Sequence, residues 1–306
     1  MAYRFERDFA TVQDGVRRLA VELIDDAVEC AGGKGRDKNE TVHSLRKSCK
    51  KLRGLVRLVR PVFDDYRVEN AAFRNAGQDF SLLRDGGVLV ETYDSLLDAH
   101  KDQIDRSRFA PIRRRLILIK KESTERDDIG DILERFRETM LQARERACRW
   151  RIAADGFEAV GHGLRKSYKG AQRAMHAAAK EPTTEAIHEW RKRIKDHWYH
   201  ARLLSPIWQI PMRAHGEVAD RLGDALGKYH DLEVFRQRLQ DDDLVDKADL
   251  DVLAGLVRLR QNTLLERAFS IGARLLAERA ASLTRRWQSY WDVWREHEPH
   301  EAALAA

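Results

Sequence analysis

The chain has 306 residues, of which 43% are hydrophobic and 35% charged, with only 6 prolines. This length allows two domains with cores of their own, and the composition favours long, exposed helices over sheets. The formal net charge of +6 is a small difference between 56 basic and 50 acidic residues. The distribution of charge, more than its sum, must therefore indicate any anionic partner.

Several classes of protein are disfavoured at once. Cys30, Cys49 and Cys148 are far apart and form no CxxC pair, which argues against a disulfide framework or a thiolate metal site. The first residues lack the apolar run of a signal peptide. No segment approaches the roughly 18 consecutive apolar residues of a membrane span. We therefore expect a soluble, cytoplasmic protein that makes no contact with membrane.

Amphipathic helices are predicted through most of the chain, because apolar residues recur at i, i+3, i+4 and i+7. In chain order these helices cover 6–30, 40–60, 66–84, 88–99, 107–122, 128–152, 157–179, 184–204, 212–229, 231–240, 246–262 and 264–296. The links between them are short and polar or contain Gly and Pro, which implies antiparallel neighbours. The expected fold class is all-α, with helical bundles in tandem.

The two halves of the sequence repeat each other. His43 precedes Pro61 by 18 residues, and His188 precedes Pro206 by the same spacing. Each proline would end the helix that contains the histidine, because proline cannot continue the hydrogen-bond ladder. A break in the helical pattern near 153–156 divides the chain into 1–153, the first bundle, and 154–306, the second.

A basic stripe lies on the predicted helix over 40–60, and the helix over 184–204 carries its copy. Residues in a helix advance by about 100° each, which places the cations of each stripe on one arc, opposite an apolar face. The first stripe consists of His43, Arg46, Lys47, Lys50, Arg53 and Arg57. The second consists of His188, Arg191, Lys192, Lys195 and Arg202, with Trp198 at the position of Arg53.

These stripes can be a solvated surface or a binding site. An ordinary exposed face mixes both signs and gains from i, i+4 ion pairs, whereas like charges at these spacings cost folding free energy. The first stripe contains no acid. Cations that oppose folding are better explained by an anion that they bind, so we favour a binding site.

The predicted helix over 157–179 adds further positive charge. One of its faces carries Arg165, Tyr168, Lys169, Gln172, Arg173 and His176, again without an acid. The matching first-half helix retains Arg17. Arginine grips phosphate oxygens with a planar fork and lysine supplies a mobile charge. A long polyanion would suit such a repeated pattern, in a groove shared by the two halves.

The remaining motifs indicate structure and not catalysis. His197 projects onto the apolar side of its helix, and Trp287, Trp291 and Trp294 recur at i, i+4, i+7, so all four are expected in the core. The sequence has no HExxH motif, no Walker lysine loop and no Rossmann glycine fingerprint. We expect no enzymatic activity, no cofactor and no catalytic or bound metal.

At the two histidine-headed stripes the sequence resembles the CHAD family, the conserved-histidine α-helical domains. The matching runs are His43-x-x-Arg46-Lys47-x-x-Lys50-x-x-Arg53 and His188-x-x-Arg191-Lys192-x-x-Lys195, with Gly163-Leu-Arg165-Lys166-Ser-Tyr168-Lys169 upstream of the second. The resemblance implies two pseudo-symmetric four-helix bundles with a basic central groove. It also implies that the residues of both stripes contact inorganic polyphosphate, and that the protein acts as a targeting or scaffolding module at polyphosphate granules.

The alternative is a basic protein that binds nucleic acid through the same faces. The sequence contains no recognisable reader motif. Aromatic residues do not interleave with the stripes, as binding of single strands would favour. We therefore expect nucleic acid to be a weaker competitor of polyphosphate.

Overall fold

The structure is a computed structural model that describes residues 3–33, 37–124, 128–240 and 247–296. Throughout these ranges the chain forms helices joined by turns, and no strand occurs in them, which confirms the all-α class. The elements are α1 (Val12–Gly32), α2 (Lys38–Leu58), α3 (Tyr66–Gln78), α4 (Ser81–Ala99), the 3₁₀ helix η1 (Arg106–Phe109), α5 (Ala110–Thr124), α6 (Ile129–Ala147), α7 (Gly156–Lys180), α8 (Thr184–Leu203), the 3₁₀ helix η2 (Ser205–Ile207), α9 (Gln209–Gln240), α10 (Lys247–Leu275) and α11 (Ala280–Glu296).

Local sequence determines where the two stripe-bearing helices begin and end. The side chain of Asp37 accepts a hydrogen bond from the backbone N–H of Glu40 at the start of α2, and Thr183 caps α8 in the same way. Helix α2 ends at Leu58 and α8 at Leu203, each shortly before its proline. The predicted ends of both helices are confirmed.

Other predicted boundaries are wrong. The segments expected as two helices over 212–229 and 231–240 form the single helix α9, because its buried face continues without interruption through Leu232 and Phe235. The break expected near 263 is absent, and α10 runs on to Leu275 before a turn leads into α11.

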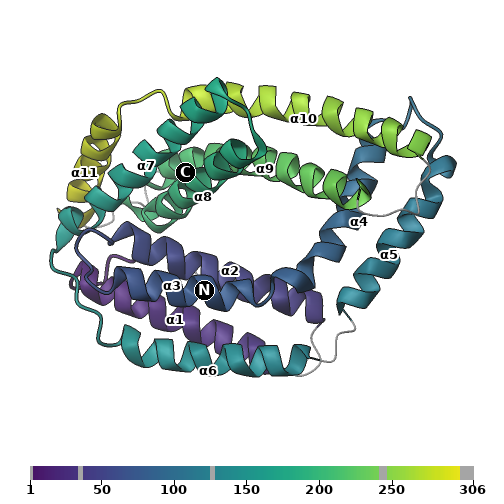
Figure 1. Ribbon diagram of the computed structural model, residues 1–306. Helices are drawn as coiled ribbons and strands as arrows, with labels where there is room; N and C mark the ends of the chain where they lie inside the picture. The colour runs from purple at the N-terminus through teal and green to yellow at the C-terminus, as the bar shows by residue number, and fades with distance from the viewer. Residues whose placement is uncertain (1–2, 34–36, 125–127, 241–246, 297–306) are drawn as a thin grey trace, which may run out of the picture.

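Two hydrophobic clusters hold the helices together, and each joins both halves of the sequence. The larger cluster packs α1, α2, α3 and α6 against α7, α8, α11 and the first part of α9. The smaller one packs α4 and α5 against the later part of α9 and against α10, on the right of Figure 1. The boundary near residue 153 and the pseudo-symmetry of the halves stay predictions.

The predicted core aromatics lie largely where expected. Trp287 is fully buried and Trp291 nearly so, whereas Trp294 is only partly buried against the larger cluster. His197 is completely buried, stacked on Trp287, with its Nε2 2.7 Å from Nε2 of His215. No helix among the described residues is long and apolar enough to cross a membrane.

Helix α2 crosses α7 and α8 at very short range because glycines lie at the crossing points. A Cβ atom on Gly163 of α7 would be 1.7 Å from the carbonyl oxygen of Leu58. A Cβ atom on Gly54 of α2 would be 2.8 Å from Cβ of Tyr199 on α8. His200 Nε2 donates a hydrogen bond to the Gly54 carbonyl (3.1 Å) at the same crossing. The side chains that flank α2, α7 and α8 are thereby brought close together.

Replacing Gly163 with alanine should lower the free energy of unfolding by about 3 kcal/mol, because a backbone carbonyl cannot move aside as a side chain can. Gly255 in α10 has open space around it. The control Gly255→Ala should raise stability by about 0.5 kcal/mol, through a smaller loss of chain entropy. Urea unfolding of both variants measures the difference, and equal stabilities would contradict the close crossing.

Candidate functional site

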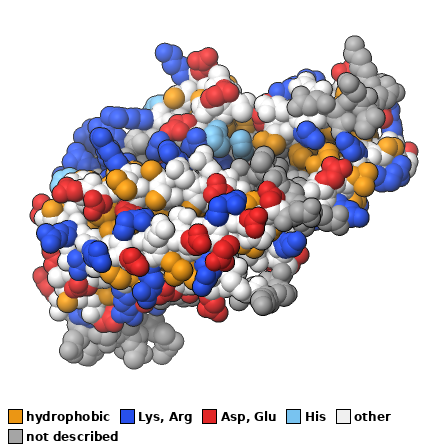
Figure 2. Space-filling view, turned by 60° about the horizontal axis from the view of Figure 1, so that its bottom comes forward, with side chains coloured by type: hydrophobic (Ala, Val, Ile, Leu, Met, Phe, Trp, Pro, Cys, Tyr) orange, Lys and Arg blue, Asp and Glu red, His pale blue; other side chains and the backbone are white. Residues whose placement is uncertain are grey.

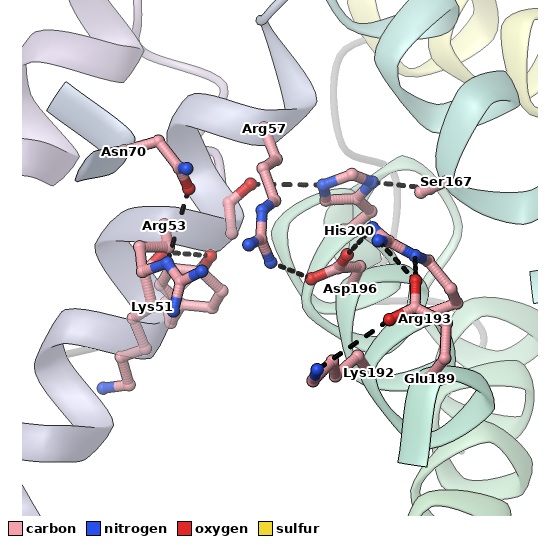
Figure 3. Close-up of polar contacts among 12 residues, drawn as sticks. Lys51, Arg53, Arg57, Asn70, Ser167, Glu189, Lys192, Arg193, Asp196 and His200 are labelled. Carbon is pink, nitrogen blue, oxygen red and sulfur yellow. Dashed lines mark hydrogen bonds and ion pairs between the residues drawn. The ribbon is translucent and has the colours of Figure 1, made fainter. Parts of the chain in front are cut away.

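The basic stripe of α2 divides into an exposed part and a part turned toward neighbouring helices. His43, Lys47 and Lys50 are exposed. Arg46 donates from Nη1 to the carbonyl of Gly77 at the end of α3 (3.2 Å). Arg53 donates from Nε to Oδ1 of Asn70, also on α3 (3.3 Å; Figure 3).

The stripe of α8 does not face α2 as expected, because much of it packs against α9. Lys195 pairs with Asp220 of α9 (2.9 Å), and its aliphatic stem lies against Gly223. Arg191 lies beside Gly227 of the same helix. Gly223 and Gly227 leave room for these long side chains, and Asp220 neutralises the charge of Lys195. The groove with two basic walls stays a prediction, and these two side chains of α8 pack against α9.

The other members of the second stripe differ in exposure. Lys192 is exposed, with Nζ 3.9 Å from the Glu189 carboxylate. His188 is half-buried and its ring lies 4.4 Å from that of His230 on α9. Burial, with smaller contributions from His230 and neighbouring cations, lowers the pKa of His188 to about 4.

Three further predicted contact residues have partners within the protein. Tyr168 is 0% exposed and donates its hydroxyl hydrogen bond to the carbonyl of Leu275 (3.0 Å), so its prediction as a surface contact is wrong. Arg17 donates from Nε to the carbonyl of Trp150 (2.7 Å) and thereby ties α1 to the segment after α6. Arg202 lies over the ring of Trp198, 4.9 Å from its centroid.

A different set of cations meets where α2 crosses α7 and α8. They surround a pocket of about 300 Å³, which we call the basic pocket. Its lining residues are Arg57, Arg60, Lys166, Ser167, Lys169, Gly170, Arg173, Arg193, Asp196 and His200. Among the described lining residues, six cations face one carboxylate.

Sequence reasoning identified half of these cations. Arg57, Lys169 and Arg173 were predicted, whereas Arg60, Lys166 and Arg193 were not. The missed residues lie at the edges of the basic faces, and only the helix crossing shows that they converge. Arg165 is exposed on α7 but is not among the residues that line the basic pocket.

Asp196 links the two basic helices at the basic pocket. This buried carboxylate pairs with Arg57 of α2 and with Nη1 of Arg193 on its own helix (3.2 Å; Figure 3). Arg193 is also held by Glu189, 2.6 Å away. Burial raises the pKa of Asp196, and the adjacent Arg57 acts in the opposite direction. The carboxylate fixes the two guanidinium groups and offsets part of their repulsion.

The other cations of the basic pocket are not paired with Asp196, as Arg57 and Arg193 are. Burial lowers the pKa of Arg60 and of Arg53, and Arg57 lowers that of Arg53 further. His200, with its Nδ1 2.8 Å from Ser167 Oγ, is buried, and burial lowers its pKa to about 3. A neutral histidine adds no further positive charge to the cluster.

One face of the molecule shows a similar contrast in charge (Figure 2). Figure 2 shows Lys and Arg side chains gathered densely at the end of the molecule that carries α7 and α11 in Figure 1. Over most of the rest of that face, acidic and basic side chains are mixed. Throughout the described ranges, no group of three or more His, Cys, Asp or Glu side chains is arranged to hold a metal ion. The side chains that cluster on the described chain are therefore cations and not metal ligands.

Comparison with known proteins identifies a family and a solved structure with a similar fold. A family model described as the CHAD domain matches residues 20–240. The crystal structure of the CHAD domain from the plant Ricinus communis superposes with a TM-score of 0.63, covering 90% of this chain and 95% of that one. Sequence identity in that match is 16%, so the likeness concerns the fold. No curated protein sequence matches the chain.

Stability should fall as the pH is lowered from 7 to 5. The unfolded chain protonates His200 near its ordinary pKa of about 6.5, whereas folding lowers this pKa to about 3. At pH 5 the unfolded state therefore binds more protons, which costs about 2 kcal/mol of stability for this residue. Urea unfolding of His200→Gln at both pH values should show a pH effect smaller by about that amount. An undiminished pH effect would contradict the assignment of His200 as a buried neutral group.

Proposed function

The chain belongs to the CHAD domain family, and from this premise we propose that it binds inorganic polyphosphate without catalysing its turnover. The basic pocket is the observation that carries the proposal. It places six cationic side chains and one carboxylate around about 300 Å³. A ligand with one or two charges would leave most of this positive charge uncompensated, whereas linked phosphates supply several charges within a short length.

The side chains suit phosphate because of both their chemistry and their support. Arg57 and Arg173 can donate paired N–H groups to phosphate oxygens, and Lys166 and Lys169 supply mobile ammonium groups. All four extend from helices that the larger hydrophobic cluster holds in place. Because the helices are already fixed, their side chains lose little conformational freedom when the anion binds, which favours affinity.

The stripe of α2 favours a long chain over a single phosphate group. Lys50 and Arg57 are two helical turns apart on one face of α2, about 10 Å along its axis. Lys47 and His43 continue this face and are exposed. A polyphosphate held in the basic pocket can therefore continue along α2, with each further contact releasing counterions.

Polyphosphate fits the basic pocket better than nucleic acid does. Among its described lining residues there is no Trp, Tyr or Phe on which a base could stack. Nucleic acid would contact the same cations through its phosphates alone and compete weakly. In the cell, polyphosphate binding would place the protein on cytoplasmic polyphosphate granules as a targeting or scaffolding module.

Reversing three exposed charges of α7 tests the proposal. The variant Lys166→Glu, Lys169→Glu, Arg173→Glu should reduce polyphosphate affinity at least a hundredfold, because it replaces attraction by repulsion at the basic pocket. The slope of log affinity against log salt should flatten by about 2, the counterion release of three lost contacts. Calorimetric titration with long-chain polyphosphate at several salt concentrations measures both quantities.

A matched control separates this effect from net charge. Lys101→Glu, Arg238→Glu, Arg258→Glu changes the charge by the same amount at exposed positions on or beside elements of the smaller cluster. This control should bind polyphosphate nearly as well as the unmodified chain. Equal losses in both variants would mean that overall charge, and not the basic pocket, carries the binding. DNA that displaces polyphosphate at equal phosphate concentration would also contradict the proposed preference.

Asp196 should limit the affinity of the basic pocket. Asp196→Asn keeps the size of the side chain but removes the carboxylate that occupies Arg57 and Arg193. We expect tighter polyphosphate binding, by severalfold, together with a lower melting temperature, because the two guanidinium groups lose their buried partner. Titration and thermal unfolding check the two effects, and weaker binding by a folded variant would contradict this role.

A further inference from the structure

A second pocket, which we call the aromatic pocket, lies beside α8 and the start of α9. It has a volume of about 480 Å³ and is lined in part by Trp198, Arg202, Ile210, Met212, Arg213 and Glu217. Among described residues it shares no lining residue with the basic pocket. The proposed polyphosphate site therefore does not account for it.

The aromatic pocket exists where the second half departs from the basic pattern of the first. Trp198 takes the place that Arg53 has in α2. Two cations lie close to its ring, with Lys195 Nζ 4.4 Å and the Arg202 guanidinium carbon 4.9 Å from the ring centroid. This arrangement fixes an indole beside positive charge, where cations and aromatic rings attract each other.

Apolar surface continues from this ring to the rim of the aromatic pocket. Ile210 is 71% exposed, and Met212, two residues further along the chain, is a buried lining residue of the same pocket. Trp208, which lies in the turn just before α9, is 51% exposed and packs edge-on against Tyr290 of α11. Large apolar side chains left open beside a cavity are typical of a site that takes an organic ligand.

The aromatic pocket has a more mixed set of charges than the basic pocket, which favours a ligand that also has hydrogen-bond donors. Arg4, Arg202 and Arg213 line it together with two acids, Glu217 and Asp220. Asp220 is paired with Lys195, whereas Glu217 is exposed. An ionised inorganic phosphate chain has no hydrogen-bond donors to offer a carboxylate. A ligand with hydroxyl or amino groups as well as phosphates can satisfy both kinds of side chain.

We propose that the aromatic pocket binds a nucleoside phosphate. The base packs on the apolar surface of Trp198 and Ile210, the phosphates bind the arginines, and Glu217 accepts hydrogen bonds from sugar hydroxyl or base amino groups. One ligand class thus accounts for the aromatic ring, the cations and the acid in a single cavity. The proposal does not depend on polyphosphate binding, because the two pockets use different side chains.

Calorimetric titration with ATP tests the proposal, and saturable binding to the full chain is expected. Trp198→Arg, which installs the residue of the first half, should weaken ATP binding about tenfold or more, the loss expected when a base loses its aromatic support. Polyphosphate affinity should stay unchanged. Unchanged or tighter ATP binding in this variant would show that charge alone attracts the nucleotide, and would overturn the proposal.

Titrations of two further variants show whether a loss of ATP binding is due to misfolding or to the basic pocket. Ile210→Ser alters an exposed side chain and should weaken ATP binding severalfold, without changing the far-UV circular dichroism. The variant Lys166→Glu, Lys169→Glu, Arg173→Glu should bind ATP as the unmodified chain does. Loss of ATP binding in that variant would assign ATP to the basic pocket. If the unmodified chain binds no ATP, the aromatic pocket is not a nucleotide site and the proposal is overturned.

Discussion

The close crossing of α2 over α7 and α8 is the constraint on which the rest of the structure depends. Gly163 and Gly54 allow backbone and side chain to approach where any larger residue would collide. This approach forces the cations that flank α2 and α7 into one small pocket. Their mutual repulsion would open the crossing if nothing opposed it. The hydrophobic cluster that spans both halves of the sequence supplies the opposing free energy.

Two groups limit the electrostatic cost of the crossing without removing its positive potential. Asp196 pairs with one arginine from each side, and His200 stays neutral because it is buried. Burial lowers the pKa of Arg60, and Asp196 is the only carboxylate among the described lining residues of the basic pocket. A bound polyanion would replace repulsion by attraction at the point where the helices meet, so binding and stability should be coupled.

Sequence reasoning reached the all-α class, the two stripe helices and their ends, because helical periodicity and proline positions are local properties. It could not tell which helix each face would meet. Lys195 belongs to a stripe by periodicity, yet Asp220 and Gly223 of α9 take it out of the expected groove. Tyr168 and Lys169 share one face of α7 in a helical projection. Only part of that face is exposed to solvent, and Tyr168 lies on the part that packs in the core, where its hydroxyl donates a hydrogen bond to the carbonyl of Leu275 at the end of α10. Arg60 and Lys166 converge only through the crossing, which depends on contacts distant in sequence.

The central claim is that a polyanion binds where α2 crosses α7 and α8. A crystal structure of the chain with a short inorganic polyphosphate tests it most directly. We expect phosphate density in contact with Arg57, Lys166, Lys169 and Arg173, continuing toward Lys50 on α2. Ordered polyphosphate along the α8 and α9 surface, with the basic pocket empty, would contradict it.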